Sequence, residues 1–142
     1  MSDPLSELQV LVVDDQKSMR GILRGLLQSI GIRGVTEAAN GLEALAHLQN
    51  TKKQCDLIMC DLYMEKMDGM ELCNRIRNDA VLRSRLIPIL ILTGETNQLV
   101  LDVVQQVGAA TILKKPVAPQ ELKSTIQRLV GFSSGKSPVK VS

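Results

Sequence analysis

The chain has 142 residues, of which 44% are hydrophobic, so it is long enough for one domain with a hydrophobic core. Its 17 basic and 15 acidic residues leave a formal net charge of +2, which argues against nucleic-acid binding driven by charge. The longest apolar run, Leu86–Leu92, is too short to span a bilayer, and the N-terminal "MSDPLSEL" lacks the segments of a signal peptide, so we expect a cytoplasmic protein.

The sequence contains few of the residues that carry nucleophilic or metal-thiolate chemistry. Its three cysteines, Cys55, Cys60 and Cys73, show no C-x-x-C spacing and are expected to be reduced apolar fillers. The only histidine, His47, lies in the helical pattern "GLEALAHLQN", which argues against a catalytic Ser-His or Cys-His pair. Any chemistry is therefore expected to depend on carboxylates, lysines or hydroxyls.

Apolar runs suited to buried strands alternate along the chain with segments whose apolar residues recur at helical spacing. The predicted strands are Leu8–Val13, Val35–Ala38, Cys55–Cys60, Ile87–Leu92 and Thr111–Lys114, and the predicted helices are Lys17–Ile30, Leu42–Gln49, Asp68–Asn78, Thr96–Val107 and Pro119–Val130. This alternation predicts an α/β fold with a parallel sheet and helices on both faces. We expect one domain over residues 1–130, and a flexible tail or linker over residues 131–142, "GFSSGKSPVKVS".

Two of the predicted helices have clear apolar stripes. In Lys17–Ile30 the expected core positions are Met19, Ile22, Leu23, Leu26, Leu27 and Ile30, and Gly31 is a typical helix end. In Thr96–Val107 they are Val100, Val103, Val104 and Val107. Leu99 and Leu101 remain on the flanks of this second helix, where they either pack or contact a partner or a second copy of the chain.

Polar and charged side chains follow four of the predicted strands, at the point where each strand ends. Asp14 and Asp15 follow the first strand, Asp61 the third, Thr93 the fourth, and Lys114 and Lys115 the fifth, whereas the second ends in Ala38-Ala39 and offers nothing. Because ligands in open parallel sheets bind beyond the carboxyl ends of the strands, we expect these side chains to form one site.

Each of these residues also has an ordinary structural interpretation. Asp14 or Asp15 could be the N-cap of the following helix, and Thr93 could cap the fourth helix. Asp61 could start a turn, and Lys115 could be a solvated charge. Such residues at four strand ends on one edge of a sheet are nevertheless hard to produce by chance, so we favour a functional site.

The charges at these strand ends indicate what such a site would hold. Three carboxylates and Lys115 leave a charge of −2, which a divalent cation would neutralise, and a small site of oxygen ligands suits Mg²⁺. A carboxylate next to Mg²⁺ and an ammonium group is equipped to attack phosphorus and to form an acyl phosphate. The Thr93 hydroxyl can then donate a hydrogen bond to a phosphoryl oxygen.

The order and spacing of these motifs resemble the receiver domains of two-component response regulators, in particular the CheY-like type. The resemblance covers Gln9–Leu129 and depends on "VLVVDD", "SMRGILRGLL", "EAANGLEAL", "DLIMCDLYMEKMDGMEL", "ILTGE" and "LKKP". It implies a flavodoxin-like (βα)5 fold with the strand order 2-1-3-4-5, an order that is carried over from the family and not worked out from the sequence.

The resemblance implies that Asp61 is the phosphoacceptor, which takes its group from a phosphohistidine on a sensor histidine kinase or phosphotransfer protein. Thr93 would be the switch hydroxyl, and Lys115, which precedes a proline as the family lysine does, would contact the phosphoryl group. The Lys115–Pro116 bond is expected to be cis. The chain would then be a signalling protein and not an enzyme, because its own chemistry would be limited to phosphotransfer to itself and slow dephosphorylation.

The resemblance also implies that Mg²⁺ is the cofactor. Asp15 would bind the ion directly, Asp14 largely through water, and Asp61 and the main-chain carbonyl of Tyr63 would complete the protein ligands. Tyr63 and Glu95 stand two residues after Asp61 and Thr93, at positions that tune acyl phosphate hydrolysis in the family. A bulky Tyr63 could shield the phosphoryl group from water, which makes slow self-dephosphorylation a hypothesis.

Three positions depart from the family pattern. Glu65 replaces a common proline, Val117 a common phenylalanine, and Ile112 the usual switch tyrosine or phenylalanine. Because Ile112 has no ring and is stiff at χ1, the ring rotation of the family is not expected in its usual form.

The family implies an output surface on the fourth helix, the fifth strand and the fifth helix for an unknown output protein. Ile112 and, where they do not simply pack, Leu99 and Leu101 are the candidate residues of this surface. No nucleic acid or membrane is expected as a direct partner. The chain could be a stand-alone phosphorylation switch or the receiver module of a longer regulator. A haloacid-dehalogenase-type phosphatase is only a distant alternative: that family needs a second acid two residues after its nucleophile, and Tyr63 stands there. A flavin carrier is argued against by the acids after the first strand, which would repel the phosphate of the flavin.

Overall fold

The computed structural model describes residues 4–50, 54–79, 82 and 86–131. The elements in chain order are η1 (Pro4–Glu7), β1 (Gln9–Val13), α1 (Lys17–Ser29), β2 (Gly34–Ala38), α2 (Gly41–Asn50), β3 (Leu57–Asp61), α3 (Gly69–Arg77), β4 (Ile89–Thr93), α4 (Gln98–Gln106), β5 (Thr111–Lys114) and α5 (Pro119–Leu129). All ten predicted strands and helices are present, and the short 3-10 helix η1 was not predicted. The expected tail lies outside the described residues beyond Gly131.

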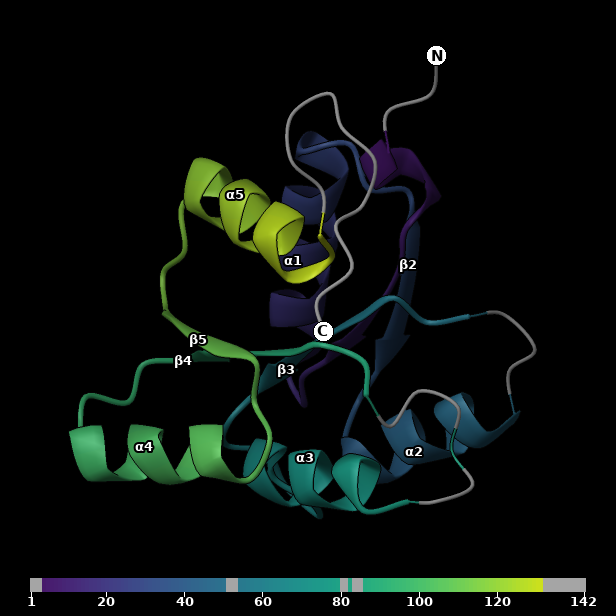
Figure 1. The fold of residues 1–142 in the computed structure, drawn as a ribbon. Coiled ribbons are helices and arrows are strands. Elements are labelled where there is room, and N and C mark those ends of the chain that lie inside the picture. The colour runs from purple at the N-terminus through teal and green to yellow at the C-terminus, as the bar shows by residue number, and fades with distance from the viewer. Residues whose placement is uncertain (1–3, 51–53, 80–81, 83–85, 132–142) are drawn as a thin grey trace.

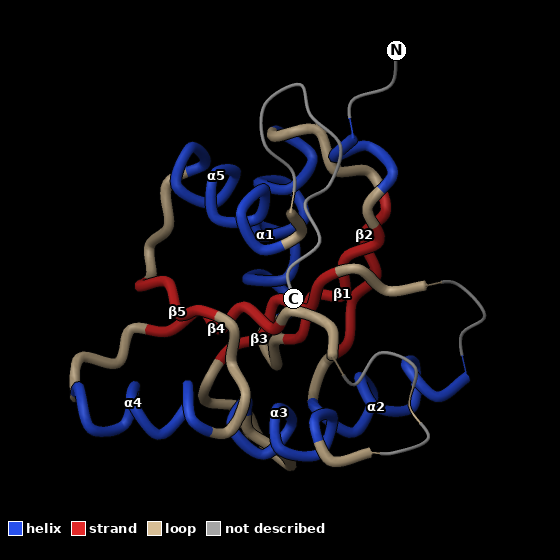
Figure 2. The backbone as a smooth tube through the Cα atoms, in the orientation of Figure 1, coloured by secondary structure: helices blue, strands red, loops and turns tan. Residues whose placement is uncertain are grey.

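The five strands form one parallel sheet in the order β2-β1-β3-β4-β5, which confirms the predicted flavodoxin-like α/β fold. Helices α1 and α5 cover one face of the sheet, and α2, α3 and α4 cover the other (Figures 1 and 2). Within the described ranges, no helix combines the length and the hydropathy that a membrane crossing requires.

The hydrophobic core consists of two layers, one on each side of the sheet. Alternate residues of a strand point to opposite faces, so Leu11 packs in the layer under α2, α3 and α4, whereas Val10 and Val12 pack in the layer under α1 and α5. Strand β4 is buried along its whole length, as expected of a central parallel strand covered on both faces.

Three elements, β3, β4 and α4, begin two residues later than predicted. The Asp56 carboxylate accepts from the Gln9 N–H and the Asp56 N–H donates to the Gln9 carbonyl, both at 2.8 Å, just before β3 begins at Leu57. Strand β4 begins after Pro88, which has no N–H to donate. The Asn97 side chain accepts from the Leu99 N–H at 3.0 Å and caps α4, which therefore begins at Gln98.

The structure corrects the predicted faces of α1 and α4. Ile22 of α1 is 57% exposed and Val103 of α4 is 43% exposed, although both were expected in the core. Leu101 is only 8% exposed and lies on the buried face of α4 with Val104. Of the two alternatives for these leucines, the structure thus favours packing for Leu101, whereas Leu99, at 76% exposed, is available for a partner contact.

Candidate functional site

The register of the parallel strands brings the predicted site residues to one edge of the sheet. Val13 pairs with Cys60, so Asp14 and Asp61 follow at the same level, and Thr93 pairs with Lys114 one residue before Lys115. Oxygen atoms of Asp14, Asp15 and Asp61 all lie within 4.8 Å of one another. The Lys115 Nζ lies 3.4 Å from Asp61 Oδ1 and 3.6 Å from Asp14 Oδ2. The three acids and Lys115 thus lie together at this edge of the sheet, as the sequence predicted.

Asp14 is 1% exposed, and it is held by its main chain as well as by its side chain. Its N–H donates to the Ala38 carbonyl at 3.1 Å, and its own carbonyl accepts from Arg20 Nη1 at 2.7 Å. Its Oδ1 accepts a hydrogen bond from the Gln16 N–H at 2.8 Å, in the turn before α1. The N-cap of α1 is Gln16, so neither Asp14 nor Asp15 caps the helix, which was the alternative interpretation. The buried Oδ2 of Asp14 has no hydrogen-bond partner.

Asp15 and Asp61 complete the acidic cluster from two loops. Asp15 is exposed, and its Oδ2 accepts a hydrogen bond from the Glu65 N–H at 3.3 Å, which joins the β1–α1 turn to the β3–α3 loop. Burial raises the pKa of the Asp61 carboxyl; Lys115 opposes this effect and the Asp14 charge adds to it. With all three carboxylates ionised, the cluster carries more negative charge than Lys115 alone balances.

The donor set fits a hard divalent cation. All three clustered groups are carboxylates, which are the ligands that Mg²⁺ prefers in proteins. The buried Asp14 Oδ2 accepts no hydrogen bond and has only the Lys115 ammonium nearby, at 3.6 Å, and a buried carboxylate oxygen without a hydrogen bond is costly. A bound cation would remove that cost. The Tyr63 carbonyl stays a predicted ligand.

Thr93 is buried at the end of β4, and its Oγ1 accepts a hydrogen bond from the Glu95 N–H at 3.1 Å. It does not cap α4. The Glu95 carboxylate accepts from the N–H groups of Thr96 and Asn97 at 2.9 and 3.1 Å, and from the Tyr63 hydroxyl. The β3–α3 and β4–α4 loops are therefore tied together next to Thr93.

The remaining predicted residues lie around strand β5. The Lys115–Pro116 peptide bond is cis, as expected, and the Lys115 N–H donates to the Thr93 carbonyl at 3.0 Å. Ile112 is partly buried and packs against the core layer under α4, together with Val100 and Val107. An aliphatic packing residue thus occupies the place where the family has its switch ring.

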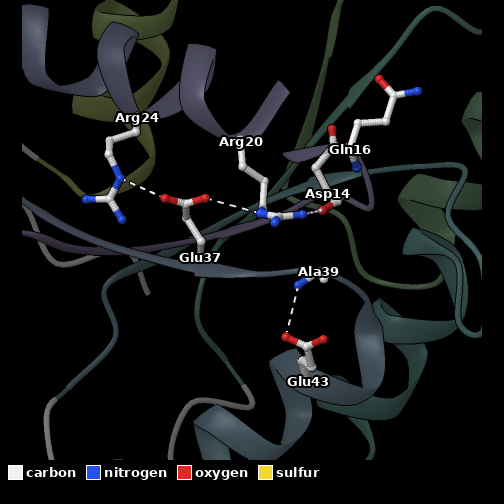
Figure 3. A network of polar contacts seen from close by, with 7 residues as sticks. All are labelled: Asp14, Gln16, Arg20, Arg24, Glu37, Ala39 and Glu43. Atoms are coloured by element: carbon white, nitrogen blue, oxygen red, sulfur yellow. Dashed lines mark hydrogen bonds and ion pairs between the residues drawn. The ribbon is translucent and has the colours of Figure 1, made fainter. Parts of the chain in front are cut away.

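Behind Asp14 lies a polar network that was not predicted from the sequence (Figure 3). Arg20 donates through Nε to Glu37 Oε1 at 3.1 Å, and Arg24 donates through Nε to the other oxygen, Glu37 Oε2, at 2.8 Å. Strand β2 was expected to offer the site nothing, but its Ala38 carbonyl accepts from the Asp14 N–H, and its Glu37 binds Arg20, which donates to the Asp14 carbonyl. The sequence offered only a weak signal for this network: two arginines four residues apart and one acid on the predicted edge strand.

Comparison with known proteins agrees with this geometry. A model of the response regulator receiver domain family matches residues 10–127. The chain is 31% identical to the chemotaxis protein CheY1 of Helicobacter pylori over 87% of this chain and 98% of that protein. Its structure is similar to that of the chemotaxis protein CheY4 of Vibrio cholerae, with a TM-score of 0.74 and 37% identity over 86% of this chain and 98% of that one.

A further similar structure is the receiver domain of the sensor histidine kinase PA1611 from Pseudomonas aeruginosa PAO1, which has a magnesium ion coordinated in its active site cleft. The TM-score is 0.76 and the identity 28%, over 87% of this chain and 98% of that one.

Proposed function

Because the chain belongs to the response regulator receiver domains of two-component systems, with CheY-like relatives, we propose that Asp61 accepts a phosphoryl group from a phosphohistidine. The donor would be a sensor histidine kinase or a phosphotransfer protein, the partners with which receiver domains interact. The observation that carries the proposal is the Lys115 ammonium 3.4 Å from Asp61 Oδ1, at the edge of the three-acid cluster. The haloacid-dehalogenase alternative is set aside, because the matched family is a different one.

In the proposed reaction an Asp61 carboxylate oxygen attacks phosphorus. The new O–P bond forms as the N–P bond breaks, and the imidazole of the donor leaves with the electron pair of that bond. Lys115 neutralises charge on the phosphoryl oxygens, and the Thr93 hydroxyl donates a hydrogen bond to one of them. The chain itself would act as a phosphorylation switch in the cytoplasm and not as an enzyme with turnover.

Mg²⁺ would be held by Asp15 and Asp61, by Asp14 largely through water, and by the Tyr63 carbonyl. When bound, the ion offsets the negative charge of the acids and of the transferred group. Support for this assignment comes from the buried Asp14 Oδ2, which accepts no hydrogen bond, and from the all-carboxylate cluster.

Phosphorylation would replace a carboxylate of charge −1 by a group of charge near −2. Thr93 would respond by turning its hydroxyl toward that group, which changes its contact with the Glu95 N–H and shifts the population of the β4–α4 loop. The exposed Leu99 on α4 is then the best candidate for contact with an output protein or with a second copy of the chain. Ile112 would follow this change by repacking, since it has no ring to rotate.

Intact mass after incubation with acetyl phosphate tests this proposal. The wild-type protein should gain one phosphoryl group only when Mg²⁺ is present, and Asp61→Asn should gain none. Loss of the group under alkaline conditions would identify an acyl phosphate. No mass gain in the wild type, with the fold intact, would contradict the proposed function.

A further inference from the structure

All but one of the polar atoms of Asp14 have a hydrogen-bond partner in the described part of the chain. Its N–H, its carbonyl and its Oδ1 are bound to Ala38, Arg20 and Gln16 respectively. The free atom is Oδ2, which is buried and lies 3.6 Å from Lys115 Nζ. The surroundings of Asp14 thus fix its backbone and its Oδ1, and they leave Oδ2 on the side of Lys115, whose Nζ also lies 3.4 Å from Asp61 Oδ1.

Of the three groups that bind Asp14, those of Ala38 and Gln16 belong to the main chain and only that of Arg20 to a side chain. The Arg20 side chain makes two contacts at once. Its Nη1 donates to the Asp14 carbonyl at 2.7 Å, while its Nε donates to Glu37 Oε1 at 3.1 Å (Figure 3). The guanidinium fork therefore joins the β1–α1 turn to strand β2. The Arg20 side chain is 15% exposed, which makes its geometry more restricted than that of a surface ion pair.

Glu37 is itself fixed from both sides. Arg24 binds the carboxylate oxygen that Arg20 does not use, and its side chain is 36% exposed. Hydrogen bonds from Arg24 and Arg20 lower the pKa of Glu37 below its ordinary value, as expected of a carboxylate that accepts from two guanidinium groups. Arg24 does not share the Asp14 contact, which makes it a natural control for Arg20.

We propose that Arg20 is a positioning residue for the cation site: it holds the Asp14 peptide against strand β2 so that Oδ2 faces Asp15 and Asp61. The inference rests on the proposed Mg²⁺-dependent function. Arg20 also carries a positive charge near the site, and charge alone would weaken cation binding. Positioning and charge therefore act in opposite directions, and a charge-conserving substitution separates them.

The experiment measures the Mg²⁺ dissociation constant of the unphosphorylated protein by isothermal titration calorimetry. A lysine at position 20 keeps the charge but cannot form both bonds with a fixed fork, so Arg20→Lys should bind Mg²⁺ about tenfold more weakly, as loss of a supporting residue around a metal ligand typically does. Arg24→Lys, which alters only the Glu37 contact, should stay within about twofold of wild type. Arg20→Gln should also bind more weakly, although charge alone predicts tighter binding.

Urea unfolding of each variant shows that it is folded under the titration conditions. Equal affinities of wild type, Arg20→Lys and Arg24→Lys would overturn the inference and leave the proposed function standing. A wild-type protein that does not bind Mg²⁺ would overturn both. If Arg20→Lys does not fold, the charge-conserving Glu37→Asp carries the comparison, because the shorter side chain keeps the charge but loses the paired contacts with Arg20 and Arg24. It should weaken Mg²⁺ binding more than Arg24→Lys does, and an affinity equal to that of Arg24→Lys would overturn the inference.

Discussion

The Tyr63 hydroxyl donates a hydrogen bond to the Glu95 carboxylate and so joins the loop after β3 to the loop after β4. Both residues stand two positions beyond a proposed functional residue, Asp61 in one case and Thr93 in the other. The same carboxylate accepts the N–H groups at the start of α4. Any movement of the β4–α4 loop is therefore coupled to Tyr63, and the phenol can report on it.

Tyr63 should titrate at a higher pH than an ordinary tyrosine. The hydrogen bond to Glu95 and the charge of Glu95 raise the pKa of the phenol, and the same bond lowers the pKa of Glu95. Since the chain has one tyrosine and no tryptophan, the ultraviolet absorbance of the phenolate measures this pKa without interference. In Glu95→Gln the pKa should fall toward its ordinary value, and an unchanged titration curve would show that the bond does not form in solution.

Asp61→Asn should stabilise the metal-free protein at neutral pH. The folded pKa of Asp61 lies above its unfolded value, so the folded state binds more protons between these two values, and stability falls as pH rises through that interval. Removing one of three carboxylates within 4.8 Å should raise the free energy of unfolding by on the order of 1 kcal/mol. Urea unfolding at neutral pH measures the effect.

Mg²⁺ should make the wild type more stable than Asp61→Asn, the reverse of the order expected without the ion. A ligand at a hundred times its dissociation constant stabilises the folded state by about 2.7 kcal/mol, and only the wild type retains all three acids. The unfolding midpoint of the wild type should therefore rise with Mg²⁺ much more than that of Asp61→Asn. Equal shifts in the two proteins would place the cation elsewhere.

Two exposed glycines make α1 less stable than it could be. A Cβ added to Gly21 or Gly25 would meet nothing within 4 Å, so replacement by alanine should stabilise the protein by roughly 0.5–1 kcal/mol at each position. Gly108→Ala is the contrasting change, because its φ is +128° and a Cβ would lie 2.6 Å from Arg77 Cγ. Thermal unfolding should show higher midpoints for the first two variants and a lower one for the third.

Leu99 and Leu101 should respond differently to the same truncation. Leu101→Ala removes a side chain that is 8% exposed and should cost about 2–5 kcal/mol, whereas Leu99→Ala should change stability by less than about 0.5 kcal/mol. Chemical denaturation of both variants measures the difference. Comparable losses of unfolding free energy for Leu99→Ala and Leu101→Ala would contradict the assignment of Leu101 to the buried face of α4 and of Leu99 to the exposed face. If the assignment holds, a stable Leu99→Asp variant is the appropriate probe of a partner surface on α4.

Much of the fold could be predicted from the sequence, because central parallel strands such as β4 are continuous apolar runs and the α1 helix ends before Gly31, whose φ is +101°. The convergence of acids and lysine followed from the rule that strand ends share one edge of the sheet. The buried side of α4 did not follow, because its valines and leucines are all apolar and only packing against the sheet decides which of them is buried.

The network behind Asp14 was also beyond the sequence analysis. Its contacts join residues that are far apart along the chain, such as Arg20 and Glu37, and each is individually typical of a solvated surface charge. Only the pairing of β1 with β2 shows that Glu37 lies across from the β1–α1 turn. The strand that provides no ligand therefore contributes to the site through main-chain and ion-pair contacts.

The position of the phosphoryl group tests the central claim most directly. After incubation with acetyl phosphate and Mg²⁺, borohydride reduces an acyl phosphate on aspartate to homoserine, and tandem mass spectrometry locates the altered residue. The account predicts this conversion at Asp61 alone, and only in samples that contained Mg²⁺. Conversion at Asp14 or Asp15, or an unchanged yield without Mg²⁺, would contradict it.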